Sequence, residues 1–268
     1  MILRPIDRET LRHEFTTASP FRFVRIEPFL DRAFAEEVAA SYPTFERATA
    51  HGRVFRTVNE RMKVQITDPT LFPEPVRRLH EVLASPAFID DLSTITGIPG
   101  LLADEQLEGG GMHVTGPGGR LDVHLDFNYL EARKLHRRVN LLLYLNPTWQ
   151  DRWGGHLELW DREMRRCERR FAPLLNRCLV VETTNVSFHG VTPVTPDAPL
   201  PRRSFAAYYY TREAPADVAA PVSSTMFRAR PEEWVRAWVL MPGERIQRQL
   251  GMGLRRITRT ARRFLGRS

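Results

Sequence analysis

The sequence predicts a mainly β domain, an antiparallel barrel or double-sheet jelly roll, with helices before it and a helical tail after it. Residues 105–212 contain six short apolar segments bounded by turn residues, with no helical pattern between them. Strands that follow one another without helices favour antiparallel sheets that close into a barrel or a sandwich. The first third of the chain instead shows apolar residues at helical spacing.

The six expected strands cover residues 120–127, 139–145, 156–160, 177–182, 187–191 and 203–211. Turn residues separate them at GPGG (116–119), NP (146–147), GG (154–155) and PVTPDAPLP (193–201). Three helices are expected before them. Asp31 is the N-cap of a helix over 32–41, Pro73 and Pro75 open a second, and a third runs from Ser85-Pro86 to Gly97.

The composition indicates a folded protein with reduced cysteines. Of its 268 residues 42% are hydrophobic, which is enough to fill a core. Cys167 and Cys178 are too few for a disulfide framework and form no CxxC pair. We find neither a secretory apolar run at the N-terminus nor the roughly 18 apolar residues of a spanning helix. We therefore expect a cytoplasmic protein.

The positive charge is concentrated near the C-terminus. Residues 227–268 hold 11 arginines and 3 glutamates, whereas the rest of the chain carries 28 basic and 29 acidic residues. This balance argues against a nucleic-acid partner for the main body. We expect one domain over 1–213, with a helical N-terminal segment (1–104) and a jelly-roll core (105–213). A linker and a basic amphipathic tail follow over 214–268.

The tail repeats apolar residues at helical spacing between 246 and 265, with its arginines mostly on other faces. We expect a helical appendage that is dispensable for chemistry beyond about residue 227. Docking of its apolar stripe on the protein's own surface, or on the partner of a homodimer, is the simpler hypothesis. Association with anionic lipid at a membrane surface, or with nucleic acid, is the alternative.

The segment RLDVHLDFN places His124 and Asp126 on one face of a strand, with Asp122 in the same row. One imidazole and one carboxylate from this strand, with a second imidazole from elsewhere, would occupy three facial positions of an octahedral metal. The three open positions suit oxygen chemistry at iron. The HxD pair alone is weak, because a surface histidine beside a solvated aspartate gives the same pattern.

The remaining motifs strengthen this hypothesis. His189 lies in SFHGVTPV, and Arg202-Arg203 follow 13 residues later. With GRLDVHLDFN, RRVNLLLYLNPTW, WGGHLELWD and RRSFAAYYYT, residues 105–212 resemble the prolyl-4-hydroxylase-like branch of the iron(II)/2-oxoglutarate-dependent oxygenases in order and spacing. The segment FRFVRIEPFLDRAFAEEVAASYP also resembles the N-terminal region of bacterial and fungal members.

The resemblance implies a double-stranded β-helix, the cupin-like jelly roll, with Fe(II) bound by His124, Asp126 and His189. It implies that Arg202 pairs with the distal carboxylate of 2-oxoglutarate, a role that suits the planar guanidinium. Tyr144 and Ser204 would add hydroxyl groups to that carboxylate site, and Leu142, Asn140 and Leu157 would line the co-substrate pocket. His113 and His136 are expected to be non-ligands, as is His156, which is a candidate for substrate contact. Asp122 is expected to face solvent or a basic partner.

The implied activity is a dioxygenase that hydroxylates an unactivated C–H bond of a prolyl or other amino-acid-derived substrate. Dioxygen and 2-oxoglutarate would be consumed, and succinate and carbon dioxide released. The substrate would be a small molecule or a peptide, and ascorbate is a candidate further cofactor. The presence of Asp126 favours hydroxylation over halogenation, since halogenating relatives lack this carboxylate.

Two other functions remain open. Nucleic-acid dealkylases of the family carry a second arginine six residues after the first, where this chain has Tyr208. A catalytically silent barrel that binds a partner through its basic tail is the alternative outside enzyme chemistry.

Strand alternation separates the two adjacent arginines. Arg202 shares its row with Ser204, Ala206, Tyr208 and Tyr210, whereas Arg203 shares its row with Phe205, Ala207 and Tyr209. The second row is the more apolar, so we expect it to pack under the N-terminal helices. Arg202 is then the residue that faces the interior of the barrel.

Overall fold

The structure, a computed structural model, describes residues 2–215, 222–233 and 235–241. Its helices are α1 (Arg8–Thr17), α2 (Arg32–Ser41), α3 (Phe45–His51), α4 (Glu74–Leu83) and α5 (Pro86–Thr96), with short helical turns at Pro69–Leu71, Asp151–Trp153 and Arg236–Leu240. Its strands are β1 (Phe23–Ile26), β2 (Arg53–Arg56), β3 (Glu60–Ile66), β4 (Leu102–Ala103), β5 (Gly111–Leu125), β6 (Tyr129–Leu130), β7 (Leu135–Tyr144), β8 (Leu157–Trp160), β9 (Cys167–Phe171), β10 (Cys178–Glu182), β11 (His189–Val191), β12 (Arg202–Thr211) and β13 (Met226–Arg228).

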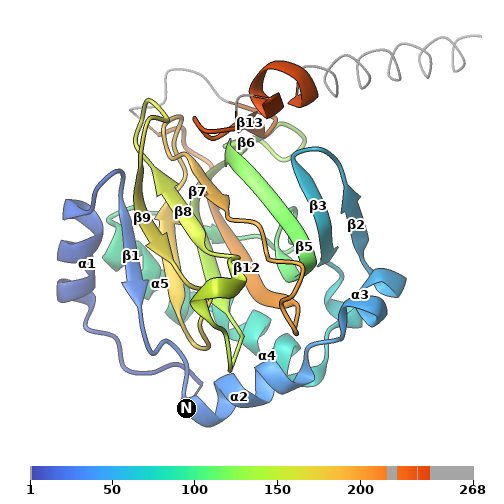
Figure 1. The fold of residues 1–268 in the computed structure, drawn as a ribbon. Coiled ribbons are helices and arrows are strands. Elements are labelled where there is room, and N and C mark those ends of the chain that lie inside the picture. Colours follow the sequence, from blue (N-terminus) through green and yellow to red (C-terminus); the bar gives the residue numbers. More distant parts are fainter. Residues whose placement is uncertain (1, 216–221, 234, 242–268) are drawn as a thin grey trace, which may run out of the picture.

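The strands form one curled antiparallel sheet in the order β1-β10-β7-β12-β5-β11-β8-β9 (Figure 1). The first half of β5 pairs with β12 and β3, and its second half pairs with β11 and β13. Because β5 belongs to both halves of the sheet, it joins them into the double-stranded β-helix that the sequence predicts.

The helices cover the outer face of the half that contains β10, β7 and β12 (Figure 1). Their capping matches the sequence. Asp31 accepts hydrogen bonds from the first amides of α2, and α5 begins at the Ser85 cap and ends at Gly97 in the left-handed conformation (φ +70°). The predicted packing of the Arg203 row is confirmed, because Phe205, Ala207 and Tyr209 lie in this core and the Tyr209 hydroxyl donates to the Leu83 carbonyl.

The expected start of a strand at residue 120 is wrong, because β5 runs from Gly111 through the GPGG segment to Leu125. GPGG does not end the strand but bulges out of it. Arg61 pairs with Arg120, whereas Lys63 pairs with Thr115, so the residues between Thr115 and Arg120 exceed what β3 can match. Within the segment, the Gly118 amide donates to the Val194 carbonyl, and the Gly119 carbonyl accepts from the Val194 amide.

The N-terminal segment 1–104 combines helices with short strands, β1 to β4, of which an extended start over 21–30 was expected and the β2–β3 hairpin was not. Val64 and Ile66 of β3 pack into the core under the helices, while Lys63 and Gln65 face the other way and line a cavity. The side chains of β3 alternate between the two faces of the sheet, as expected for a strand, but the face that lines the cavity is polar. A polar inner face resembles a solvent-exposed strand or loop in the sequence.

Residues after 222 return to the sheet, where Phe227 of β13 pairs with His124 of β5. The boundary expected after residue 213 separates β13 from the strand that it pairs with, so we propose a boundary beyond Met241. The predicted tail helix over 246–265, and most of the predicted linker over 214–223, lie outside the described residues. Among the described helices, none combines the length and apolar character needed to cross a membrane.

Candidate active site

The sequence-predicted site residues lie around one cavity of about 330 Å³ inside the curled sheet. Its lining includes all nine of them: His124, Asp126, Asn140, Leu142, Tyr144, Leu157, His189, Arg202 and Ser204. They come from β5, β7, β8, β11 and β12 and the turn after β5, so the sheet's curvature brings them together. His113 also lines the cavity, whereas His136 and His156 are absent from its lining.

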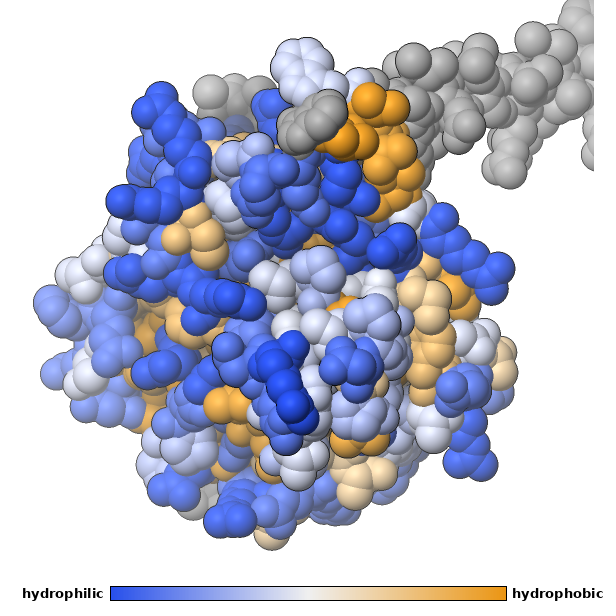
Figure 2. All heavy atoms as spheres, viewed as in Figure 1, coloured by the Kyte–Doolittle hydropathy of each residue, from blue (hydrophilic) through white to orange (hydrophobic). Residues whose placement is uncertain are grey.

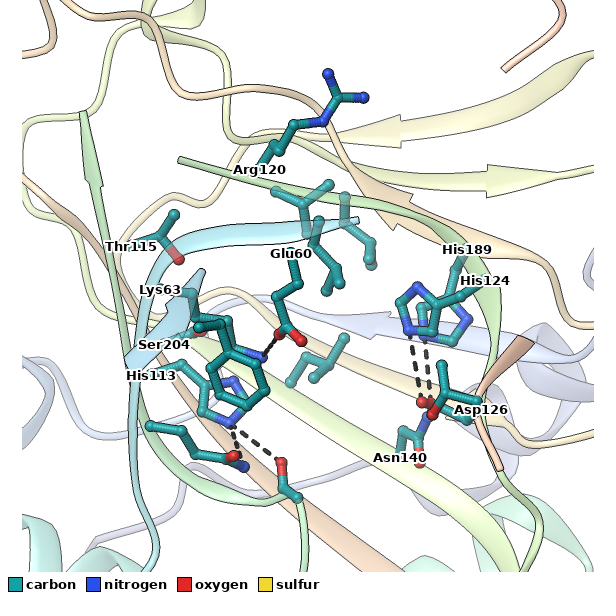
Figure 3. A pocket seen from close by; sticks show the side chains of 18 of the residues that line it. Glu60, Lys63, His113, Thr115, Arg120, His124, Asp126, Asn140, His189 and Ser204 are labelled. Atoms are coloured by element: carbon teal, nitrogen blue, oxygen red, sulfur yellow. Dashed lines mark hydrogen bonds and ion pairs between the residues drawn. The ribbon is translucent and has the colours of Figure 1, made fainter. Parts of the chain in front are cut away.

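His124, Asp126 and His189 converge at one end of the cavity (Figure 3). The Nε2 atom of His124 lies 3.5 Å from Oδ1 of Asp126, and that of His189 lies 3.4 Å from Oδ2. One donor atom from each residue falls within 4.8 Å of the others, and no second such group occurs among the described residues. His189 and His124 are cross-strand partners, which explains why their ring centres are 4.4 Å apart.

Backbone carbonyl groups fix the orientation of both imidazoles. Nδ1 of His124 lies 2.9 Å from the Asp122 carbonyl oxygen, and Nδ1 of His189 lies 2.9 Å from that of Ser187. Because a carbonyl oxygen only accepts, each Nδ1 must carry the proton and donate it. In a neutral ring the lone pair is then on Nε2, the atom that faces Asp126, and this is the arrangement that metal-binding histidines require.

Two polar side chains of β7 hold Asp126. Arg137 donates to its Oδ2 at 3.0 Å, and the Asn140 amide donates to the same atom at 2.8 Å. Burial would raise the pKa of the Asp126 carboxyl, but Arg137 and the two histidines outweigh that effect and hold it well below its usual range. The group is thus an anion, as a hard metal cation requires.

Arg137 is fully buried, and its guanidinium lies 3.4 Å from the centre of the Tyr208 ring. The cation beside Asp126 therefore comes from β7, and Tyr208 of β12 packs against it. Arg137 was not predicted as a site residue, although it lies three residues before Asn140 in the segment RRVNLLLYLNPTW.

Arg202 is buried and faces the same cavity. Its guanidinium donates to the Gly155 carbonyl at 2.7 Å and lies 4.9 Å from the centre of the Tyr144 ring. Among the described residues it forms no ion pair with a carboxylate, and burial lowers the pKa of its guanidinium. The Tyr144 hydroxyl is buried and makes no hydrogen bond to a described residue. An unpaired buried cation beside an unsatisfied hydroxyl is a site for an anion.

A row of polar side chains crosses four strands beside Arg202. Gln65, His113, Ser204 and Tyr144 are successive cross-strand partners on β3, β5, β12 and β7. His113 is 8% exposed and contacts the Gly109 carbonyl and the Gln65 amide. Burial, helped by the charges of Lys63 and Arg202, holds the pKa of His113 well below its ordinary value. Its ring is therefore neutral at neutral pH, so it adds no charge near Arg202.

Asp122 has the basic partners that we expected. It is fully buried and pairs with Arg120 and Arg236, with Arg230 at 3.8 Å. Glu233 accepts from Arg120 at 2.7 Å, which extends the cluster. The Asp122 carboxylate is thus paired with arginines, and its backbone carbonyl oxygen is the hydrogen-bond partner of His124 Nδ1.

The C-terminal segment also reaches the cavity, a contribution that we did not predict. Phe227 lines it, with its ring centre 5.5 Å from that of His124. His156, a candidate for substrate contact, instead bonds to Asp151 at 2.6 Å and lies 3.2 Å from the Arg170 guanidinium. The proline-rich and alanine-rich sequence before Phe227 gave no signal that the chain returns to the sheet.

One known family matches the part of the chain that contains these site residues. The family model described as "2OG-Fe(II) oxygenase superfamily" matches residues 110–210, which contain the triad, Tyr144 and Arg202. Residues 110–210, the part of the chain that holds the site, match the 2OG-Fe(II) oxygenase superfamily. The protein is therefore an enzyme of the iron- and 2-oxoglutarate-dependent kind. Among curated proteins, none matches it by sequence.

Solved structures of the superfamily share the fold at low identity. A prolyl-4-hydroxylase of Pseudomonas putida is 20% identical, with a TM-score of 0.53, over 76% of this chain and 100% of that one. A prolyl hydroxylase of Trichoplax adhaerens, in complex with a hypoxia-inducible-factor peptide, is 17% identical with a TM-score of 0.53, over 76% and 88%. The epimerase SnoN from nogalamycin biosynthesis is 14% identical with a TM-score of 0.52, over 83% and 94%. Hydroxylases and an epimerase thus share this fold, and the fold alone does not fix the reaction.

Proposed function

We propose that this oxygenase binds Fe(II) through His124, Asp126 and His189 and hydroxylates an unactivated C–H bond. The observation that carries the proposal is the convergence of the Nε2 atoms of two histidines, each oriented through its Nδ1, and the Asp126 carboxylate at one end of the cavity. This donor set fits ferrous iron and leaves coordination positions open on the cavity side. When bound, iron and 2-oxoglutarate supply the oxidation, coupled to the formation of succinate and carbon dioxide.

The chain's own residues divide the remaining tasks. Arg137 and Asn140 keep Asp126 ionised and oriented. We assign Arg202 to the distal carboxylate of 2-oxoglutarate, because a buried arginine without a carboxylate partner gains a charge-assisted hydrogen bond when an anion binds. The Tyr144 and Ser204 hydroxyls would complete that site, and Leu142 and Leu157 would exclude water from it.

For the substrate we propose a prolyl or other amino-acid-derived molecule. Two of the proteins that share the fold are prolyl hydroxylases. The β2–β3 hairpin supplies polar side chains to the cavity, and Lys63 lies 2.8 Å from Glu60 with both side chains largely shielded from solvent (Figure 3). Arg53 and Lys63 also lie over the Phe55 ring at 4.6 and 5.2 Å. Such a wall suits a substrate with polar or charged groups beside an apolar ring or chain.

The test measures ferrous binding without oxygen and succinate formation with oxygen. A panel of prolyl peptides and free amino acids would be screened for stimulation of 2-oxoglutarate turnover. His124→Ala or His189→Ala should abolish both ferrous binding and turnover, whereas His136→Ala, outside the cavity lining, should leave both unchanged. Full activity in either triad variant would remove the triad from the proposal. Iron binding without any succinate formation would favour the silent binding module instead.

A further inference from the structure

The short helical turn at the C-terminal end of the described chain carries a concentrated group of exposed apolar side chains. Trp238 is 80% exposed, Val239 58% and Leu240 42%, and Val235 and Met226 are exposed to a similar degree as Leu240. These five are the majority of the eight large exposed hydrophobic residues among the described ones. Figure 2 shows orange, apolar spheres gathered in the upper part of the molecule. We call Val235, Trp238, Val239 and Leu240 the apolar turn.

The apolar turn is anchored to the domain, so its exposure is not that of a loose end. Arg236, within the turn, pairs with the fully buried Asp122 and donates to the Val58 carbonyl at 2.5 Å. Two residues before the turn, Glu233 pairs with Arg120 at 2.7 Å. Glu233 and Arg236 thus pair with side chains of the domain, whereas Trp238, Val239 and Leu240 are exposed, the reverse of an ordinary surface turn.

The chain that follows this turn is strongly basic. Residues 242–268 contain eight arginines and one glutamate, a net charge of +7 that equals the net charge of the whole protein. The rest of the molecule is therefore neutral. An exposed tryptophan with aliphatic neighbours, followed directly by a run of arginines, combines the two interactions that hold peripheral proteins on anionic bilayers.

We propose that residues 235–268 dock this oxygenase on an anionic phospholipid surface. Trp238, Val239 and Leu240 would enter the interface between headgroups and acyl chains, where tryptophan is favoured and aliphatic groups leave water. The arginines after Met241 would bind the lipid phosphates and carboxylates. The anchor at Asp122 would keep the domain in a fixed orientation on the surface. The inference is independent of the assigned substrate and iron ligands.

Other occupants fit the apolar turn less well. Nucleic acid would use the arginines and could stack on Trp238, but it gains little from Val239 and Leu240, which have no π-face. A second copy of the chain would need about 800 Å² on each partner for a stable interface, more than these few side chains offer. A neutral bilayer would leave the arginines unused.

The test uses the full-length protein and vesicles of phosphatidylcholine, alone or mixed with phosphatidylserine. We expect sedimentation with the mixed vesicles at low salt, release at high salt, and little binding to phosphatidylcholine alone. Trp238→Ser with Val239→Ser should weaken binding roughly tenfold or more, as should Arg255→Gln with Arg256→Gln. Leu71→Ser is the matched control, since Leu71 is 45% exposed but lies in the turn before α4, and it should bind as the parent does.

Thermal unfolding midpoints of all variants, measured without vesicles, distinguish lost docking from lost folding. Equal binding to neutral and mixed vesicles, or binding that survives both double substitutions, would overturn the proposal. So would a short DNA or RNA duplex that binds more tightly than the mixed vesicles and displaces the protein from them. An oligomer whose formation is prevented by Trp238→Ser would also overturn it, because a second copy would then cover the turn.

Discussion

Arg137 and Asp126 form a 3.0 Å ion pair behind the candidate iron site. Arg137 is buried and Asp126 is partly buried, and the Arg137 guanidinium also lies over the rings of Tyr208 and Phe127. A carboxylate that is hydrogen-bonded on one oxygen has its remaining lone pairs directed elsewhere, here toward the two histidines. Such outer partners set the affinity of a metal site as well as its shape.

Replacing Arg137 by methionine should therefore weaken ferrous binding roughly 10- to 100-fold, the range for losing an outer partner of a metal ligand. Anaerobic titration with Fe(II) measures the change. Arg138→Met, the adjacent residue on β7, is the matched control and should alter the affinity little, because Arg138 contacts Thr211 rather than Asp126. An equal loss in both variants would mean that the effect is general destabilisation.

Arg202→Ala should weaken 2-oxoglutarate binding by roughly 2–4 kcal/mol, since truncating one partner of a buried charge pair costs this much. Arg203→Ala should change it little, because the Arg203 guanidinium donates to the Ala39 carbonyl of α2, on the other face of the sheet. The dissociation constants, measured without oxygen and with Fe(II) present, decide between them. A larger loss in the Arg203 variant would contradict the assignment.

We expect the residues after Met241 to be dispensable for turnover, and residues 226–241 to be needed for stability. A chain that ends at 241 should fold and keep turnover, because it retains Phe227 and the arginine partners of Asp122. A chain that ends at 225 loses Arg230, Glu233 and Arg236 and leaves a buried carboxylate with Arg120 alone. We expect it to be less stable by about 3–5 kcal/mol, the cost of breaking a buried ion pair. Chemical denaturation of the two chains, followed by fluorescence, gives the difference; equal stabilities would show that the cluster contributes nothing.

Acid should destabilise the protein partly through His113. Its folded-state pKa lies well below its ordinary value because the ring is buried near Lys63 and Arg202. Below about pH 6.5 the unfolded chain binds a proton that the folded chain does not, so stability falls as the pH falls, by at most about 1.4 kcal/mol per pH unit. His113→Asn should flatten this slope between pH 6.5 and the folded-state pKa. His13→Asn, at an exposed position of α1, is the control, and an unchanged slope in the His113 variant would refute the assignment.

The sequence predicts the parts of the site that depend on strand alternation and motif spacing. Residues two apart on β12 and β7 do share a face, so Arg202, Ser204 and Tyr144 meet at the cavity. Alternation fails where a strand is irregular. On β7 it places Arg138 in the row of Asn140, but a register shift opposite Tyr209 and Tyr210 turns Arg137 inward instead. The sequence of a regular strand and that of a bulged strand do not differ in an obvious way.

The pairing of strands that lie far apart in the sequence could not be predicted either. No local pattern indicates that β13 lies beside β5, because its three residues are bounded by a linker and a charged turn. The arginines after Phe227 read as part of a uniformly basic tail. In the structure Arg230 and Arg236 are inner partners of Asp122 and Glu158, while the later ones begin beyond Met241. A count of charges cannot show that Arg230 and Arg236 form ion pairs inside the domain, whereas the structure does.

The position of β5 sets the order in which the protein can be completed during synthesis. Its partners are β3, β11, β12 and β13, which extend from residue 60 to residue 228. His189 cannot meet Asp126 until residue 191 has been made and paired, and Phe227 reaches His124 later still. Between the synthesis of β5 and that of β11, the second half of β5 therefore lacks its partner strands β11 and β13. The three residues proposed to bind iron therefore come together only after β11 has been made and has paired with β5.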